Sequence, residues 1–126
     1  DDKMLAYCFS SVEGYSKMGQ YIGNGATSGT AGTYVHLGFR PSFVMLKSTG
    51  SGSWWILDST RDPFNEALRA LQANDPAVET GYSGNFLDFY SNGFAPRTSG
   101  SQVNGSGTTY IYMAFAEAPF KYANAR

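Results

Sequence analysis

The stretch that decides the fold is GSGSWWILDSTRDP, residues 50–63, which places the only two tryptophans of the chain side by side. Flanking Gly, Ser and Pro residues favour turns, so the apolar centre WWILD is predicted to be a short β-strand. Neighbouring side chains of a strand point to opposite faces. Trp54 and Trp55 are therefore expected to lie on different sides of a sheet.

The two faces of this predicted strand differ in character. Trp55 and Leu57 form a face with no polar group beyond the indole N–H, and this face is expected in the core. Trp54, Ile56 and Asp58 form a face that ends in a carboxylate, so it is expected to point toward solvent, a groove or a neighbouring subunit. An outward indole has two interpretations: it packs against another loop or subunit, or it offers a flat surface on which a ligand stacks.

Length and composition indicate one globular domain over residues 1–126. Aromatic residues make up 16% of the chain and there are 15 glycines, as expected for aromatic strands joined by Gly-rich turns. A net charge of −1 without a basic run argues against nucleic-acid binding. No apolar run approaches the ~20 residues that span a bilayer, so no membrane insertion is expected.

The chain has one cysteine, Cys8, and one histidine, His36. An intrachain disulfide and the Cys/His metal patterns are therefore excluded, and no metal or cofactor is predicted. Cys8 is expected to be a small packed residue. His36 falls on the polar face of its predicted strand, without a nucleophile motif nearby, which favours a surface histidine.

The remaining pattern predicts an all-β fold, an antiparallel, jelly-roll-like β-sandwich of about 7–9 short strands. The Asn92–Gly93 pair between aromatic alternations predicts a hairpin with positive φ at both residues. Residues 65–73 leave two possibilities open, one short helix or a strand over 69–73. The other predicted strands cover residues 4–12, 15–22 with the Met18/Ile22 side inward, 34–39, 43–47 and the segment beginning at 109.

A sugar ring is the ligand that best suits an outward indole with hydrogen-bonding side chains near it. Asp58 and Arg61 are close enough in sequence to Trp54 to bind sugar hydroxyls. Loops at a sandwich end also carry binding residues. The predicted ligand-binding residues are Trp54, Asp58, Arg61, Tyr82 and Asn85.

Carboxylates recur at a spacing of four in Asp58, Asp62 and Glu66. Two acids that converge at about 5–10 Å could hydrolyse a glycoside. Solvated loop acids are the simpler interpretation, because Pro63 interrupts any shared helical face. No catalytic residue is predicted, and the protein is not expected to be an enzyme.

Four stretches together carry a family resemblance: residues 7–25 (YCFSSVEGYSKMGQYIGNG), 37–47 (LGFRPSFVMLK), 89–94 (FYSNGF) and 109–126 (TYIYMAFAEAPFKYANAR). They resemble a C-terminal β-rich domain of tailed-bacteriophage virion proteins of the tail-fibre or receptor-binding type, which often follows a concanavalin-like lectin domain. The resemblance implies that the chain is part of, or the C-terminal end of, a larger virion protein made in the host cytoplasm. It also implies partners: a host cell-surface glycan or receptor, other virion proteins, and copies of itself in a homotrimer.

The leading hypothesis is therefore a phage appendage domain that contacts a host surface glycan by aromatic stacking and loop hydrogen bonds. The first alternative is a purely structural virion protein, either a head or tail decoration or a trimerising tip, without ligand. A polysaccharide depolymerase is the third hypothesis, and it requires two convergent carboxylates in a groove.

Overall fold

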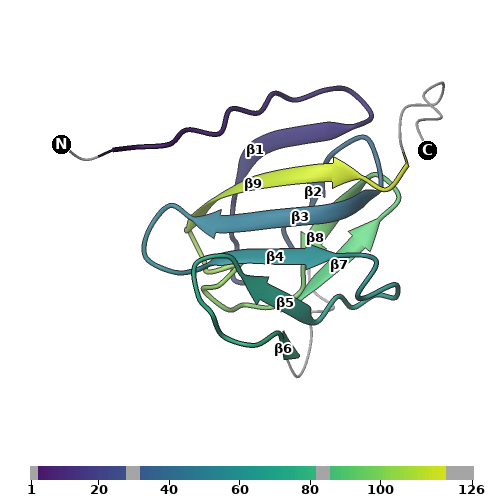
Figure 1. Cartoon of the computed structure of the whole chain (residues 1–126). Coiled ribbons are helices and arrows are strands. Elements are labelled where there is room, and N and C mark those ends of the chain that lie inside the picture. Colours follow the sequence, from purple (N-terminus) through teal and green to yellow (C-terminus); the bar gives the residue numbers. More distant parts are fainter. Residues whose placement is uncertain (1–2, 28–31, 82–85, 119–126) are drawn as a thin grey trace.

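The computed structural model describes residues 3–27, 32–81 and 86–118 and folds them into two antiparallel β-sheets packed face to face (Figure 1). Nine strands form in this part of the chain, and none of it is helical. It therefore holds no helix long and apolar enough to cross a membrane. The predicted all-β, two-sheet architecture is confirmed, and residues 65–73 contribute a strand rather than a helix.

The larger sheet has six strands and the smaller has three. The order of the larger sheet is β1 (Ser16–Ile22), β9 (Thr109–Ala116), β3 (Pro41–Ser48), β4 (Trp54–Asp58), β5 (Arg69–Gln72) and β6 (Thr80–Gly81). The order of the smaller sheet is β2 (Val35–His36), β8 (Gly93–Pro96) and β7 (Leu87–Tyr90). β3 begins at Pro41, a position where the missing N–H of proline is tolerated, and it belongs to a different sheet from β2.

Aromatic side chains join the two sheets across the core. Tyr21 and Tyr112 of the larger sheet both meet Phe94 of the smaller one edge-to-face, with ring centroids 6.0 and 5.6 Å apart. Trp55 meets Phe86 in the same way at 5.6 Å. Such pairs add specific geometry to the hydrophobic burial that holds the sandwich together.

The strand β4 has the orientation that its sequence predicts. Trp55 is 6% exposed and Leu57 is fully buried, whereas Trp54 is 38% exposed. Ile56 and Asp58 lie half-buried on the same side as Trp54. Each face of the larger sheet thus receives one indole.

The hairpin of β7 and β8 forms as predicted, but its turn is displaced by one residue. Ser91 and Asn92 make the turn, while Gly93 already pairs with Tyr90. The glycine is required for close approach: a Cβ atom here would lie 2.2 Å from the Val35 carbonyl oxygen. The prediction of positive φ at Gly93 was therefore wrong, because steric space and not turn conformation selects glycine.

The predicted inward face of β1 was also wrong. Tyr21 is buried and Ile22 is exposed. Pairing with β9 stacks the Tyr21 ring on that of Tyr110, with centroids 5.1 Å apart. The Tyr21 hydroxyl donates to the Val103 carbonyl at 2.6 Å, so the polar tip enters the core with a partner.

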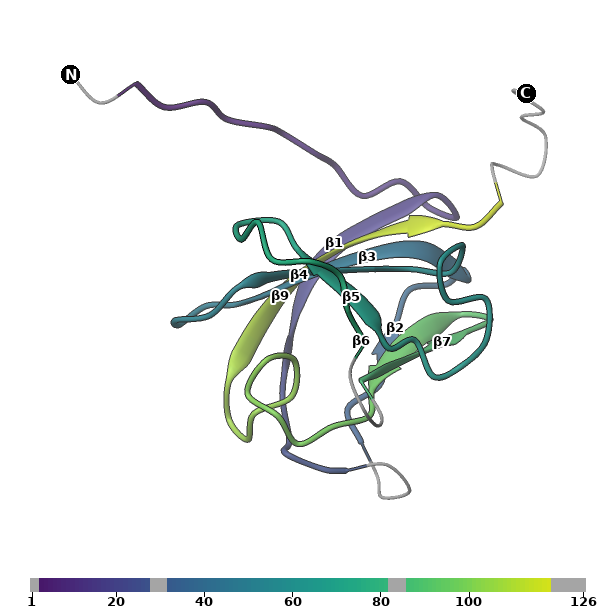
Figure 2. The same cartoon turned by 60° about the horizontal axis from the view of Figure 1, so that its bottom comes forward.

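Residues 4–12 do not form the predicted strand. Residues 3–11, named here the N-terminal arm, are all exposed, and the arm leaves the two sheets toward its N-terminal end (Figures 1 and 2). Pairing with β1 stops after a single bridge between Val12 and Ser16. Cys8 is consequently exposed, contrary to its expected packing, because a strand-like pattern buries nothing when no other strand lies against it.

Candidate functional site

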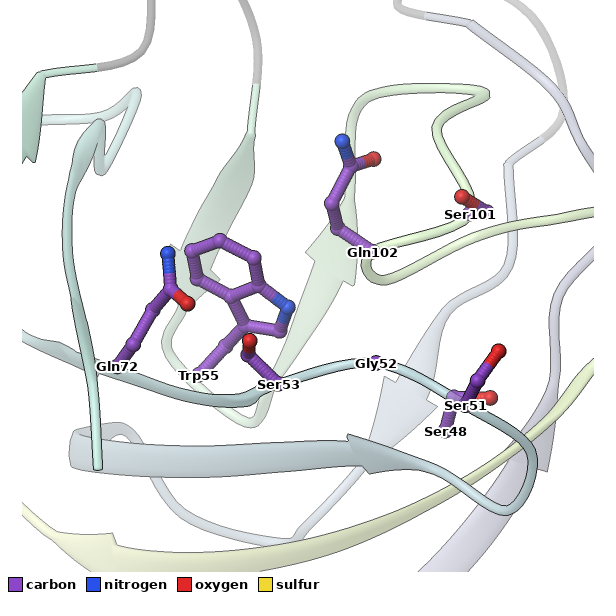
Figure 3. A pocket seen from close by; sticks show the side chains of 8 residues that line it. All are labelled: Ser48, Ser51, Gly52, Ser53, Trp55, Gln72, Ser101 and Gln102. Atoms are coloured by element: carbon purple, nitrogen blue, oxygen red, sulfur yellow. The ribbon is translucent and has the colours of Figure 1, made fainter. Parts of the chain in front are cut away.

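A pocket of about 350 Å³ opens beside Trp55, on the core-facing side of the larger sheet (Figure 3). We call it the polar pocket. Three separate parts of the chain line it: the β3–β4 connection, the end of β5 and the long loop before β9. The lining residues are Ser48, Ser51, Gly52, Ser53, Trp55, Gln72, Ser101 and Gln102.

The β3–β4 connection is shaped by its own hydrogen bonds. The Ser48 hydroxyl accepts from the Gly50 amide at 3.1 Å, and the Lys47 ammonium donates to the Gly50 carbonyl at 2.8 Å. Gly52 has φ +130°, a conformation that residues with a Cβ rarely adopt. These features bend residues 49–53 so that Ser51 and Ser53 reach the pocket.

The opposite wall is fixed to the core by Tyr110 of β9. Its hydroxyl donates to the Ser101 carbonyl at 2.7 Å and accepts from the Gly105 amide at 2.8 Å. The Tyr21 hydroxyl holds the Val103 carbonyl of the same loop. Two buried tyrosines therefore position a polar loop and present Gln102 to the pocket.

The pocket lining carries no charged side chain. Serine hydroxyls and glutamine amides both donate and accept hydrogen bonds. In Figure 3 the indole of Trp55 stands between the Gln72 side chain and the serines of the opposite side. Because Trp55 is nearly buried, a ligand in the pocket could contact only the edge of its indole and could not stack on the ring face. A volume of about 350 Å³ lies within the range of small-molecule sites, and this lining suits a neutral, polyhydroxylated ligand.

Three of the predicted binding residues, Trp54, Asp58 and Arg61, do not line the polar pocket. The Trp54 side chain is on the opposite face of the sheet, and its backbone amide donates to Asn74 Oδ1 at 2.7 Å. Asp58 is on the same face as Trp54, but four residues of extended strand separate them by about 13 Å. That span is too great for one sugar ring to stack on the indole and reach the carboxylate. Tyr82 and Asn85 lie outside the described residues.

Asp58 and Arg61 bind each other and organise the connection after β4. Asp58 Oδ1 accepts from the amides of Thr60 at 3.1 Å and Arg61 at 2.8 Å, and its other oxygen pairs with the Arg61 guanidinium. Arg61 also contacts Glu79 at 3.3 Å. Burial opposes ionisation of Asp58, yet the hydrogen bonds and charge of Arg61 outweigh it, so the pKa of Asp58 lies below its ordinary 3.8.

Asp62 has a similar structural role. Its Oδ2 atom accepts from the amides of Leu68 at 2.7 Å and Arg69 at 2.6 Å, where β5 begins. The expectation of solvated loop acids was therefore wrong for Asp58 and Asp62, which hold backbone amides. Across residues 3–27, 32–81 and 86–118, no group of three His, Cys, Asp or Glu side chains is placed to hold a metal ion. His36 is exposed on the polar face of β2, as predicted.

Sequence reasoning missed the pocket residues because they are distant in the chain. Gln72 and Gln102 belong to segments that carry no motif, and only the fold brings them beside Trp55. The available signal was the pair of polar, Gly/Ser-rich stretches at 48–53 and 98–107. Such stretches mark the loops at a sandwich end, where binding residues are concentrated.

The family model of DUF7483, a domain of unknown function, matches residues 1–119. The chain belongs to the DUF7483 family. No curated protein and no solved structure matches it. The family description assigns no activity to this DUF7483 domain, so its function must be inferred from the arrangement of its residues.

Proposed function

We propose that this DUF7483 domain is a non-enzymatic carbohydrate-binding domain that holds a neutral segment of a host surface glycan in the polar pocket. The observation that carries the proposal is the pocket lining, in which serine hydroxyls, two amides and an indole edge surround about 350 Å³ without a charged side chain. Sugar hydroxyls need both donors and acceptors, which serine and glutamine provide together.

The proposed setting is an external appendage of a tailed bacteriophage, and it follows from the sequence resemblance over residues 7–25, 37–47, 89–94 and 109–126. In the proposed setting, one virion carries many copies of the domain. Weak individual sites then act together through effective concentration, so a shallow, uncharged pocket suffices for attachment.

The test is a glycan-array screen of the purified domain, followed by titration calorimetry with the best-bound glycan. The double variant Gln72→Ala/Gln102→Ala is expected to weaken binding at least tenfold, because each buried glycan hydroxyl that it leaves unpaired costs about 1–3 kcal/mol. Gln20→Ala removes an exposed amide of β1, far from the pocket, and is expected to leave the affinity within twofold of the original.

The variant Trp54→Ala distinguishes binding in the polar pocket from binding on the outer face of the larger sheet. If the glycan occupies the polar pocket, this variant binds as the original does. Loss of binding in Trp54→Ala with full binding in the glutamine double variant would move the site to the outer face. Absence of any bound glycan across the array would overturn the proposal.

A purely structural role is the second candidate, and one observation favours it. The face that carries Trp54 has half-buried or exposed apolar side chains on each of the strands β1, β9, β3, β4 and β5. Extended apolar surface of this kind marks contacts between proteins more often than contacts with sugars. The two roles use opposite faces of the larger sheet, so one domain can serve both.

A further inference from the structure

The outward face of the larger sheet carries a continuous row of apolar side chains. One residue from each of five adjacent strands contributes, and each is the register partner of the next. None of the five is fully buried. The row, named here the outer apolar row, consists of Met18, Met113, Met45, Ile56 and Leu71.

Further apolar side chains border this row on both sides. Ile111 and Trp54 lie on one flank. Lys47 lies between them and is the register partner of both. Phe115 and Phe43 lie on the other flank, with ring centroids 6.0 Å apart. The face is rich in methionine and aromatic side chains, which adapt their shape to a partner and are enriched where proteins meet.

The N-terminal arm carries a second group of apolar side chains, and these are exposed. Met4, Leu5, Tyr7 and Phe9 all belong to it, and Tyr7 and Phe9 are 79% and 57% exposed. Side chains of this kind gain free energy when they leave water. Met4, Leu5 and Tyr7 remain mostly exposed within the described part of their own chain.

The base of the arm is fixed at the edge of the larger sheet. The Ser16 hydroxyl donates to the Ser10 carbonyl at 3.1 Å, and the Met18 amide donates to the Ser11 hydroxyl at 3.1 Å. Phe9 already touches the outward face, where its ring meets Phe115 edge-to-face at 6.2 Å. Beyond this contact, the arm points away from its own sheet (Figure 2).

We propose that the arm of one copy lies across the outer apolar row of a second copy and so joins chains into an assembly. Two observations select a second copy as the occupant. The arm projects from its own molecule with its apolar side chains exposed, and every copy carries a half-buried apolar row on the outward face of its larger sheet. The polar pocket lies on the other face, so this contact is independent of the proposed glycan binding.

The available area is sufficient for a stable contact. An aromatic side chain buries about 150–250 Å². At the observed exposures, the four apolar residues of one arm can bury roughly 500 Å² on this scale. A reciprocal exchange of two arms buries on the order of 1,000 Å² of arm surface and comparable area of the two faces, which reaches the size of specific interfaces.

Photo-cross-linking from Cys8 tests where the arm lies. Cys8 is the only cysteine and is exposed in the arm, so a benzophenone maleimide attaches at this one site. The expected result is a covalent dimer in which mass spectrometry finds Cys8 joined to the peptide around Met45 or Met113 of another chain. Cross-links confined within one chain, or none to these strands, would overturn the proposal.

Sedimentation equilibrium tests whether the arm drives assembly. The variant Tyr7→Ser/Phe9→Ser is expected to raise the dissociation constant at least tenfold. Its fold should remain intact, because both side chains lie outside the core. Phe64→Ser is the matched control, since Phe64 is 82% exposed but distant in sequence from the arm, and it should leave assembly within twofold. A monomeric unmodified protein at millimolar concentration, or equal assembly of the two variants, would contradict the inference.

Discussion

The two faces of the larger sheet come from the same strands, yet they meet opposite surroundings. On β4, Trp55 and Leu57 enter a core closed by the smaller sheet, whereas Trp54 and Ile56 face outward beside other apolar side chains. The inner face explains why the chain folds. The outer face also carries half-buried apolar side chains, and these are the basis of the contact between copies that we propose.

The inner face should carry most of the stability, and alanine substitution of neighbouring residues measures this directly. Leu57→Ala removes a fully buried side chain and is expected to lower the free energy of unfolding by about 2–5 kcal/mol. Ile56→Ala, one position along the same strand, should cost at most about 1 kcal/mol. Urea denaturation at low protein concentration measures both losses of unfolding free energy. Similar losses for the two variants would contradict the claim that the inner face carries most of the stability.

On the inner face, two tyrosines allow a hydroxyl that has hydrogen-bond partners to be compared with one that has none in the described part of the chain. Tyr110→Phe leaves the Ser101 carbonyl and the Gly105 amide without their partner, with an expected cost of about 1–3 kcal/mol. Tyr112→Phe is the control, because the Tyr112 hydroxyl has no hydrogen bond within residues 3–27, 32–81 and 86–118. Thermal denaturation of both variants tests this, and an equal effect would show that the hydroxyl of Tyr110 does not hold the loop.

Asp58, on the outer face, is expected to make a smaller contribution to stability, and this contribution depends on pH. Its pKa is lowered in the folded state, so the stabilisation is complete above about pH 5 and is lost as the pH falls below 3.8 through the folded value. Asp58→Asn keeps the oxygen that accepts from the amides of Thr60 and Arg61 but removes the charge. The stability difference should be under about 1 kcal/mol at pH 7 and should shrink as the pH falls below 3.8. A difference independent of pH would contradict this role.

The sequence correctly predicts which face of a strand is buried where the apolar side chains of the alternating pattern are the ones that enter the core. The alternation of β4 predicted its two faces correctly, because Trp55 and Leu57 are both apolar and both inward. The same rule failed on β1, where hydrophobicity favoured Ile22 over Tyr21. Tyrosine can occupy the core once its hydroxyl has a partner, and that partner, the Val103 carbonyl, is remote in sequence.

The arm and the pocket could not be predicted for a related reason. Residues 4–12 have a strand-like composition, but a strand forms only when another strand pairs with it. The polar pocket depends on Trp55, Gln72 and Gln102 meeting through the topology of both sheets. Local patterns carry no information about such distant neighbours. The residues selected from the sequence therefore lie near Trp54 in the chain.

The most direct test of the contrast between the faces is acrylamide quenching of tryptophan fluorescence in single-tryptophan variants. Trp55→Phe reports Trp54 alone, and Trp54→Phe reports Trp55 alone. At low micromolar concentration, Trp54 should be quenched several-fold more efficiently than Trp55, and at high concentration Trp54 should become shielded while Trp55 stays unchanged. Equal quenching of the two indoles would contradict the account.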